Sequence, residues 1–156
     1  MQKITTHLWF DDRALEAAEF YTSLFEDARV LEVTHYPETA PGPTGTVMTV
    51  TFEVAGQRFI ALNGGPLFSF NESMSLYVDC EDQAEVDRLW AALTEGGEEA
   101  PCGWLKDGYG LSWQIVPRVL TELLRDPDQA AVERVMAAML RMRKIDVQAL
   151  RDAHAG

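Results

Sequence analysis

Hydrophobic and polar positions follow one pattern twice along this chain. Residues 7–25, HLWFDDRALEAAEFYTSLF, place a short apolar run before two aspartates and then apolar residues at helical spacing. Residues 75–94, SLYVDCEDQAEVDRLWAALT, repeat that order. Each copy is followed by strand-like segments that end in an apolar run, FIALNGG (59–65) and LSWQIVP (111–117). An internal repeat of this length predicts two similar β-α-β-β-β units.

The predicted fold class is α+β, with two βαβββ units forming a curved, cup-shaped mixed sheet followed by C-terminal helices. One domain spanning 1–156 is expected to hold units of about 3–65 and 73–117 and a helical tail over 118–153. Strands are expected in the first unit over 3–10, 28–36, 46–54 and 57–63, with a helix to about residue 25 capped by Asp11 or Asp12. The second unit is expected to place strands over 73–80, around 102–105 and over 111–116, with a helix over 82–95. The tail is expected to be helical over 117–125 and 127–153.

Alternation along the strands predicts which side chains face the cup. Leu8 and Phe10 share the apolar parity of the first strand and should lie under a helix, so their neighbours should face the other way. In the strand over 57–63 we expect Ile60 and Leu62 on the helix side, which places Phe59, Ala61 and Asn63 in the cup. The substrate-binding residues predicted by this reasoning are His7, Trp9, Asn63, Tyr77 and Gln114. The alternative is that this polar and aromatic face is a solvated outer surface.

Composition narrows the range of partners. The apolar fraction of 47% is ordinary for a globular protein with a sizeable core. The net charge of −12 argues against nucleic acid and against an anionic membrane as partners, since both favour Lys and Arg. The N-terminal residues contain no apolar run of signal-peptide length, and Cys80 and Cys102 lie outside any CxxC motif. We therefore expect a cytoplasmic protein with reduced thiols.

Several runs resemble one known family over residues 3–153. They are ITTHLWFDDRALEAAEFYTSLF, LNGGPLFSFNE, VDCEDQAEVDRLWAAL, CGWLKDGYGLSWQIVP and DPDQAAVERVMAAMLRMRKIDVQAL. These motifs resemble the PhnB-like branch of the glyoxalase/vicinal-oxygen-chelate (VOC) superfamily, which often carries the label 3-demethylubiquinone-9 3-methyltransferase. The resemblance implies paired βαβββ units and a homodimer.

The resemblance also implies where a divalent metal would be held. Matching the strand pattern puts the four ligand positions of the superfamily at Thr5, Ala61, Ser73 and Gln114. Of these side chains, only the Gln114 amide can bind a metal, and His7 would add a nitrogen if the register of its strand were shifted by two residues. No metal is therefore expected. No other cofactor is expected either, because neither Gly-Gly pair forms a Gly-rich turn that leads from a strand into a helix.

The sequence predicts a protein that binds a small polar or aromatic metabolite in its cup without a metal. Two alternatives stay open: a non-catalytic protein that sequesters a small molecule, and a metal-dependent VOC lyase, isomerase or dioxygenase. Whether the chain is an enzyme also stays open. We expect a homodimer, because the amphipathic tail over 127–153 carries more apolar surface than an exposed helix usually leaves bare.

Overall fold

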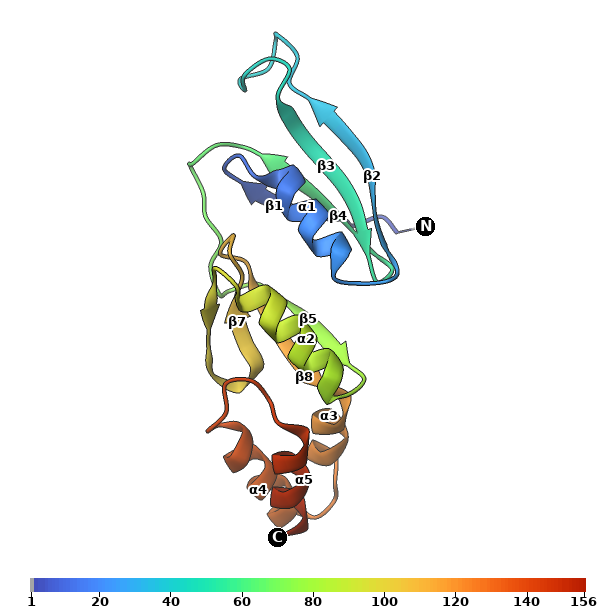
Figure 1. Ribbon diagram of the computed structural model, residues 1–156, viewed down its shortest axis with the longest axis vertical. Coiled ribbons are helices and arrows are strands. Elements are labelled where there is room, and N and C mark those ends of the chain that lie inside the picture. Colours follow the sequence, from blue (N-terminus) through green and yellow to red (C-terminus); the bar gives the residue numbers. More distant parts are fainter. Residues whose placement is uncertain (1) are drawn as a thin grey trace. The chain divides into compact units, whose positions relative to one another are not determined.

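A computed structural model describes residues 2–156 of the chain, which divides into two compact units, Met1–Phe70 and Asn71–Gly156 (Figure 1). Among these described residues, no helix combines the length and the apolar character needed to cross a membrane.

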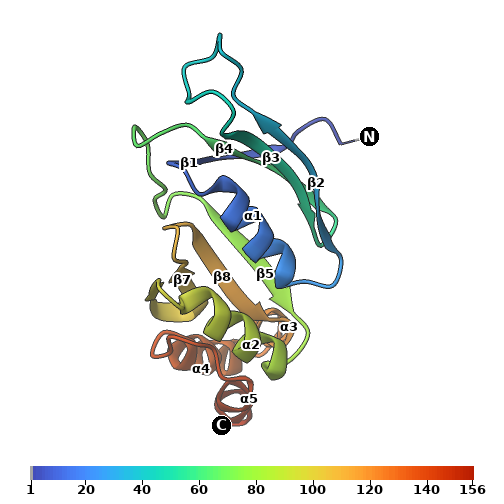
Figure 2. The same ribbon diagram turned by 45° about the horizontal axis from the view of Figure 1, so that its top comes forward.

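The first unit has the order βαβββ that the repeat predicts. Its elements are β1 (Thr6–Phe10), α1 (Ala14–Ser23), β2 (Ala28–His35), β3 (Val47–Val54) and β4 (Gln57–Asn63). They form a four-stranded sheet in the order β1-β4-β3-β2, in which β1 runs parallel to β4 and the other pairs are antiparallel. Helix α1 covers one face of this sheet (Figure 2).

The second unit repeats the order. Its elements are β5 (Ser75–Cys80), α2 (Gln83–Thr94), β6 (Glu98–Glu99), a 3₁₀ turn over Pro101–Gly103, β7 (Trp104–Lys106) and β8 (Ser112–Pro117). Their sheet order is β5-β8-β7-β6, again with the first strand parallel to the last. The α+β class is thus confirmed, with the strands in two four-stranded mixed sheets, while the shared cup stays a prediction.

Small residues let α1 pack closely on the first sheet. Ala14, Ala17 and Ala18 are all fully buried, and the larger Tyr21 lies with its ring centroid 6.2 Å from that of Phe52. Phe52 in turn stacks on a neighbouring ring of β4 at 5.3 Å. Burying each such aromatic side chain contributes about 1.5–3 kcal/mol to stability, so this face forms the core of the unit.

The face assignment is confirmed for β1 and is wrong for β4. Leu8 and Phe10 are buried as expected, but the β1–β4 register places Ala61 beside Leu8. Phe59 and Ala61 therefore lie on the α1 face and are buried, whereas Ile60 and Leu62 lie on the opposite face. The run FIAL is apolar at both parities, so its alternation cannot distinguish the two faces of a central strand.

The tail is helical as expected, but the stretch over 127–153 is divided into two helices. The tail forms α3 (Arg118–Leu124), α4 (Gln129–Met139) and α5 (Val147–Ala155). Between α4 and α5, the carbonyl oxygens of Met142 and Arg143 accept hydrogen bonds from the backbone N–H groups of Cys102 and Gly103, both at 2.8 Å. The chain leaves the helical path because these carbonyls pair with the 3₁₀ turn, and Asp146 then caps α5 through the N–H of Ala149 at 3.0 Å.

The three tail helices share a core with the second sheet. The buried members of this cluster come from β8, α3, α4, the segment before α5 and α5 itself: Val116, Leu120, Val135, Ile145 and Leu150. Part of the apolar stripe of the tail is therefore buried within the second unit, while Met136 and Leu140 are exposed.

Candidate functional site

On the first sheet, His7 and Trp9 lie on the face opposite α1. Their partners across β4 are Ile60 and Leu62, and the His7 side chain is exposed while Trp9 is half-buried. We call this surface the open face of the first sheet. It carries an imidazole and an indole on alternate residues of one strand, as the alternation predicts.

The indole of Trp9 is held by the connection that follows β4. Its Nε1–H donates to the carbonyl oxygen of Gly65 at 2.9 Å, and Phe68 meets the ring edge-to-face with centroids 4.9 Å apart. Gly64 lies so close that a Cβ there would come within 2.4 Å of the indole ring. Since its N–H is satisfied internally, Trp9 offers a ligand only the apolar surface of its ring.

Asn63 does not belong with His7 and Trp9, which corrects the expectation for this residue. It pairs with Phe10 and shares the α1 face, where its Oδ1 accepts from the backbone N–H of Ala14 at 2.8 Å and its Nδ2 donates to the carbonyl oxygen of Val47 at 3.2 Å. Asn63 thus takes the capping role that the sequence assigned to Asp11 or Asp12. The N-cap residue is instead Arg13, which makes no side-chain cap.

On the second sheet, Tyr77 and Gln114 are direct neighbours. They are register partners across β5 and β8, on the face opposite the buried Trp113 and Ile115. Gln114 Nε2 donates to Ser75 Oγ at 3.0 Å, and the Tyr77 side chain is 54% exposed. We call this surface the open face of the second sheet. That it converges with the open face of the first sheet on one pocket stays a prediction.

Three further residues of the second open face were not among the predicted binding residues. The register of β7 with β8 places Trp104 beside Gln114 and Lys106 beside Ser112. Alternation cannot show which way Trp104 faces, because β7 has only three residues. Alternation places Ser112 on the same face as Gln114, but only the register shows that Lys106 lies beside it.

One ion pair borders the second open face. The Lys106 ammonium pairs with the Glu72 carboxylate, and both side chains reach solvent. The hydrogen bond between the two groups lowers the pKa of Glu72 and raises the pKa of Lys106. Lys106 is therefore a firmly cationic group at neutral pH.

The residues present do not fit a divalent metal. Within residues 2–156, no three His, Cys, Asp or Glu side chains lie close enough together to hold an ion. Of the four positions that the resemblance implied, Ala61 lies on the buried α1 face and Ser73 Oγ donates to Asn71 Oδ1 at 2.5 Å. Of the four implied positions, only the Gln114 amide can then bind a metal, and a single amide is a poor ligand.

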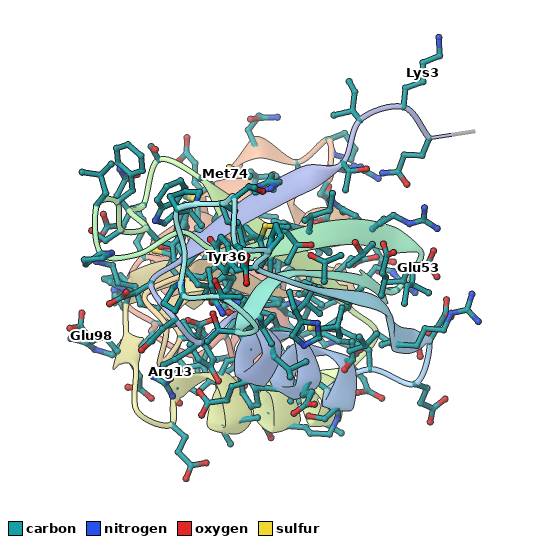
Figure 3. All side chains as sticks on the ribbon, turned by 90° about the horizontal axis from the view of Figure 1, so that it is seen from above. Lys3, Arg13, Tyr36, Glu53, Met74 and Glu98 are labelled. Carbon is teal, nitrogen blue, oxygen red and sulfur yellow. The ribbon has the colours of Figure 1, made fainter. Side chains whose placement is uncertain are left out.

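A cavity of about 700 Å³ lies in the first unit at the start of α1. Figure 3 labels Arg13, the N-cap residue of α1, and Tyr36 after β2, which both border this cavity. The loop over 41–43 and Asn63 complete much of its wall, and Tyr36 donates through its hydroxyl to the carbonyl oxygen of Asn63. Arg13 is paired with Glu16 at 2.5 Å. This cavity could not be predicted from the sequence, because a Pro- and Gly-rich loop builds one side of it.

Comparison with known proteins identifies the family. The sequence model described as 3-demethylubiquinone-9 3-methyltransferase matches residues 2–116, which leaves α3, α4 and α5 outside the match. No curated protein matches the chain.

Two solved structures extend this comparison. A PhnB protein from Bacillus cereus, described as a 3-demethylubiquinone-9 3-methyltransferase, is 39% identical, with a TM-score of 0.69 over 74% of this chain and 99% of that one. PA1353 from Pseudomonas aeruginosa shares the fold at 20% identity, with a TM-score of 0.62 over 75% of this chain and 98% of that one. The chain therefore belongs to the PhnB-like family described as 3-demethylubiquinone-9 3-methyltransferase.

Proposed function

We propose that the chain binds a small polar or aromatic metabolite at the open faces of its two sheets, with His7, Trp9, Tyr77 and Gln114 as contact residues. The observation that carries this proposal is the row formed by Trp104, Gln114 and Tyr77 on three neighbouring strands. Aromatic side chains on both sides of an amide combine apolar contact area with a directional hydrogen-bonding group, which is typical of ligand sites. Asn63 is assigned to the fold and not to the ligand.

Binding in this proposal is independent of a metal. The support is the donor set, because His7, Gln114 and the hydroxyl groups around Gln114 do not supply three ligands of the kind that zinc or manganese prefers. Elemental analysis of the purified protein tests this directly. Stoichiometric metal that chelators remove slowly would contradict it, and His7 would then be the first ligand to replace.

The proposal includes no methyl transfer. A nucleotide-type methyl donor is usually held where a Gly-rich turn leads from a strand into a helix. The pair Gly64-Gly65 follows β4, but Gly64 packs against the Trp9 ring and the chain continues into a loop. This argues against the activity in the family's description for this chain.

A sequestering role is the second candidate. The open faces combine aromatic, amide and hydroxyl groups with the imidazole of His7. Within residues 2–156, none of these groups forms a hydrogen-bonded pair of a nucleophile and a base. Recognition without bond breaking needs only such groups. Turnover of the bound compound separates an enzyme from a sequestering protein.

Small molecules that remain bound through gentle purification provide the test. We expect denaturation of the purified protein to release a compound that mass spectrometry detects. The Gln114→Ala variant should retain less of this compound. The matched control is Gln148→Ala, since Gln148 lies on α5 and its side chain donates to Asp152 at 2.9 Å. Equal retention by both variants would contradict the proposed site.

We also propose a homodimer. The tail supports this less than its sequence suggested, because Val135, Ile145 and Leu150 are buried within the second unit. Support comes from apolar side chains that each unit leaves exposed, Leu67 and Phe68 in the first and Met74 in the second. Light scattering should give twice the chain mass of 17.5 kDa, and a particle of the single-chain mass at micromolar concentration would refute the dimer.

A further inference from the structure

The second open face carries an ordered array of side chains in two rows. Register places Trp104, Gln114 and Tyr77 side by side on β7, β8 and β5. Two residues along the same strands, Lys106, Ser112 and Ser75 form the second row. We call these six residues the β7–β8–β5 array. One row is aromatic with a central amide, and the other consists of an ammonium and two hydroxyl groups.

Ser112 is the unexplained member of this array. Its side chain is 1% exposed, and its Oγ is buried without a hydrogen-bond partner within residues 2–156. The neighbouring Ser75 hydroxyl already accepts from Gln114 Nε2 at 3.0 Å. A buried polar group without a partner costs about 1–3 kcal/mol, so the Ser112 hydroxyl indicates a group that this face is built to receive.

The Lys106 ammonium indicates that the group received beside Ser112 is a carboxylate. Its ammonium already holds one carboxylate, which comes from Glu72 in the segment before β5. Both side chains of this ion pair reach solvent, and exposed ion pairs contribute little net stability. A ligand carboxylate can therefore replace Glu72 at Lys106 and accept at the same time from the Ser112 hydroxyl.

The spacing of the rows fits a small planar acid. Strands two apart in a sheet are separated by about 9.5 Å, which leaves room for one ring above Gln114 between the Trp104 and Tyr77 side chains. Rows two residues apart are separated by about 6.7 Å along the strands, close to the distance from a ring centre to the far oxygens of an attached carboxylate.

We propose that the β7–β8–β5 array binds a planar aromatic or conjugated carboxylate. The ring lies in the row of Trp104, Gln114 and Tyr77, and the carboxylate lies in the row of Lys106 and Ser112, where it displaces Glu72. This inference rests on the proposed small-molecule function and names its ligand class. No bond of the ligand breaks in this step.

Three probes of equal size separate the two features of the ligand. Binding of benzoate, benzamide and cyclohexanecarboxylate to the full chain is measured by NMR titration of backbone amides. We expect benzoate to bind about tenfold more tightly than benzamide, which lacks the charge, and several-fold more tightly than cyclohexanecarboxylate, which lacks the planar ring. Shifts should centre on β7 and β8. Equal affinities for benzoate and benzamide, or no binding of benzoate at millimolar concentration, would overturn the proposal.

Variants then assign the effect to the array. Lys106→Met should remove the preference for benzoate over benzamide, and Glu72→Gln should tighten benzoate binding severalfold because the competing carboxylate is gone. Arg118→Met is the matched control, since Arg118 forms an exposed ion pair with Asp79 at 3.0 Å outside the array. Weaker binding by Glu72→Gln, or an unchanged preference in Lys106→Met, would contradict the inference. If metabolites co-purify with the protein while benzoate fails to bind, the ligand class is wrong and the proposed function stands.

Discussion

The side-chain Oδ1 of Asn63 accepts a hydrogen bond from the backbone N–H of Ala14 at 2.8 Å, although 49 residues separate the two in sequence. Ala14 opens α1, whose first N–H groups have no partner within the helix. The end of β4 therefore caps the helix that follows β1. This bond joins the two parallel strands and their helix at the same edge of the first sheet.

Asn63→Ala should lower the free energy of unfolding by about 1–3 kcal/mol, since it removes the cap on α1 and leaves the Val47 carbonyl without its side-chain donor. Asn63→Asp keeps an oxygen acceptor for Ala14 and loses only the donor, so it should be less destabilising. Urea unfolding of both variants measures this. Ligand retention unchanged by Asn63→Asp would agree with a purely structural residue, whereas full stability of Asn63→Ala would contradict the capping role.

Substitutions of Leu8 and Trp9, which are adjacent in β1, should affect stability and ligand binding differently. Leu8 is 3% exposed on the α1 face, so Leu8→Ala should cost about 2–5 kcal/mol of stability. Trp9→Ala should cost less, because the ring is half-buried, and should weaken retention of a bound metabolite. Chemical unfolding and ligand retention are measured on both proteins. Loss of retention in Leu8→Ala at a temperature where it is fully folded would contradict this division.

Strands β1 and β4 show what can and cannot be predicted from the sequence. The βαβββ order followed from the internal repeat. The β1 faces followed from alternation, because the apolar Leu8 and Phe10 alternate with His7 and Trp9. The β4 faces did not follow, because Phe59 to Leu62 are apolar throughout and only the register with β1 decides which side chains meet α1. Asn63 was misplaced together with its strand. The same limit applies to Ser112, whose chemical setting depends on which residues β7 and β5 place beside it.

The break in the tail was hidden for a different reason. Apolar residues continue at helical spacing past α4, and local sequence alone favours a longer helix. The break depends on the carbonyl oxygens of Met142 and Arg143, which pair with a turn about 40 residues earlier in the chain. A backbone contact of this kind leaves no pattern in side-chain polarity.

Asp107 should be a strong determinant of stability in the second unit. Its side chain is 2% exposed, and its oxygens accept from the backbone N–H groups of Tyr109 and Leu111 and from Nε1 of Trp113 at 2.8, 3.1 and 2.9 Å. Asp107→Ala leaves these donors without that carboxylate, and we expect a loss of about 3 kcal/mol or more. Near-ultraviolet circular dichroism should report a changed Trp113 environment in the same variant.

Asp107→Asn is the matched control, because the amide keeps one acceptor oxygen in nearly the same volume. We expect it to retain the turn over 107–111 and to lie between the wild type and Asp107→Ala in stability. A stability of Asp107→Ala equal to that of the wild type would show that the carboxylate does not hold the turn.

The Cys80 thiol should make stability fall at alkaline pH. Burial, together with the carboxylates of Glu85 and Asp79, raises the pKa of Cys80 from 9.0 to about 12. Above pH 9 the thiol of the unfolded chain loses its proton while the folded chain retains it, so the unfolded state binds fewer protons and stability decreases as pH rises toward 12. Urea unfolding at about pH 8 and about pH 10.5 measures the decrease. It should be smaller in Cys80→Ala than in the wild type, whereas Cys102→Ala, which keeps the buried thiol, should match the wild type. An equal decrease in all three proteins would mean that Cys80 titrates alike in the folded and unfolded chains.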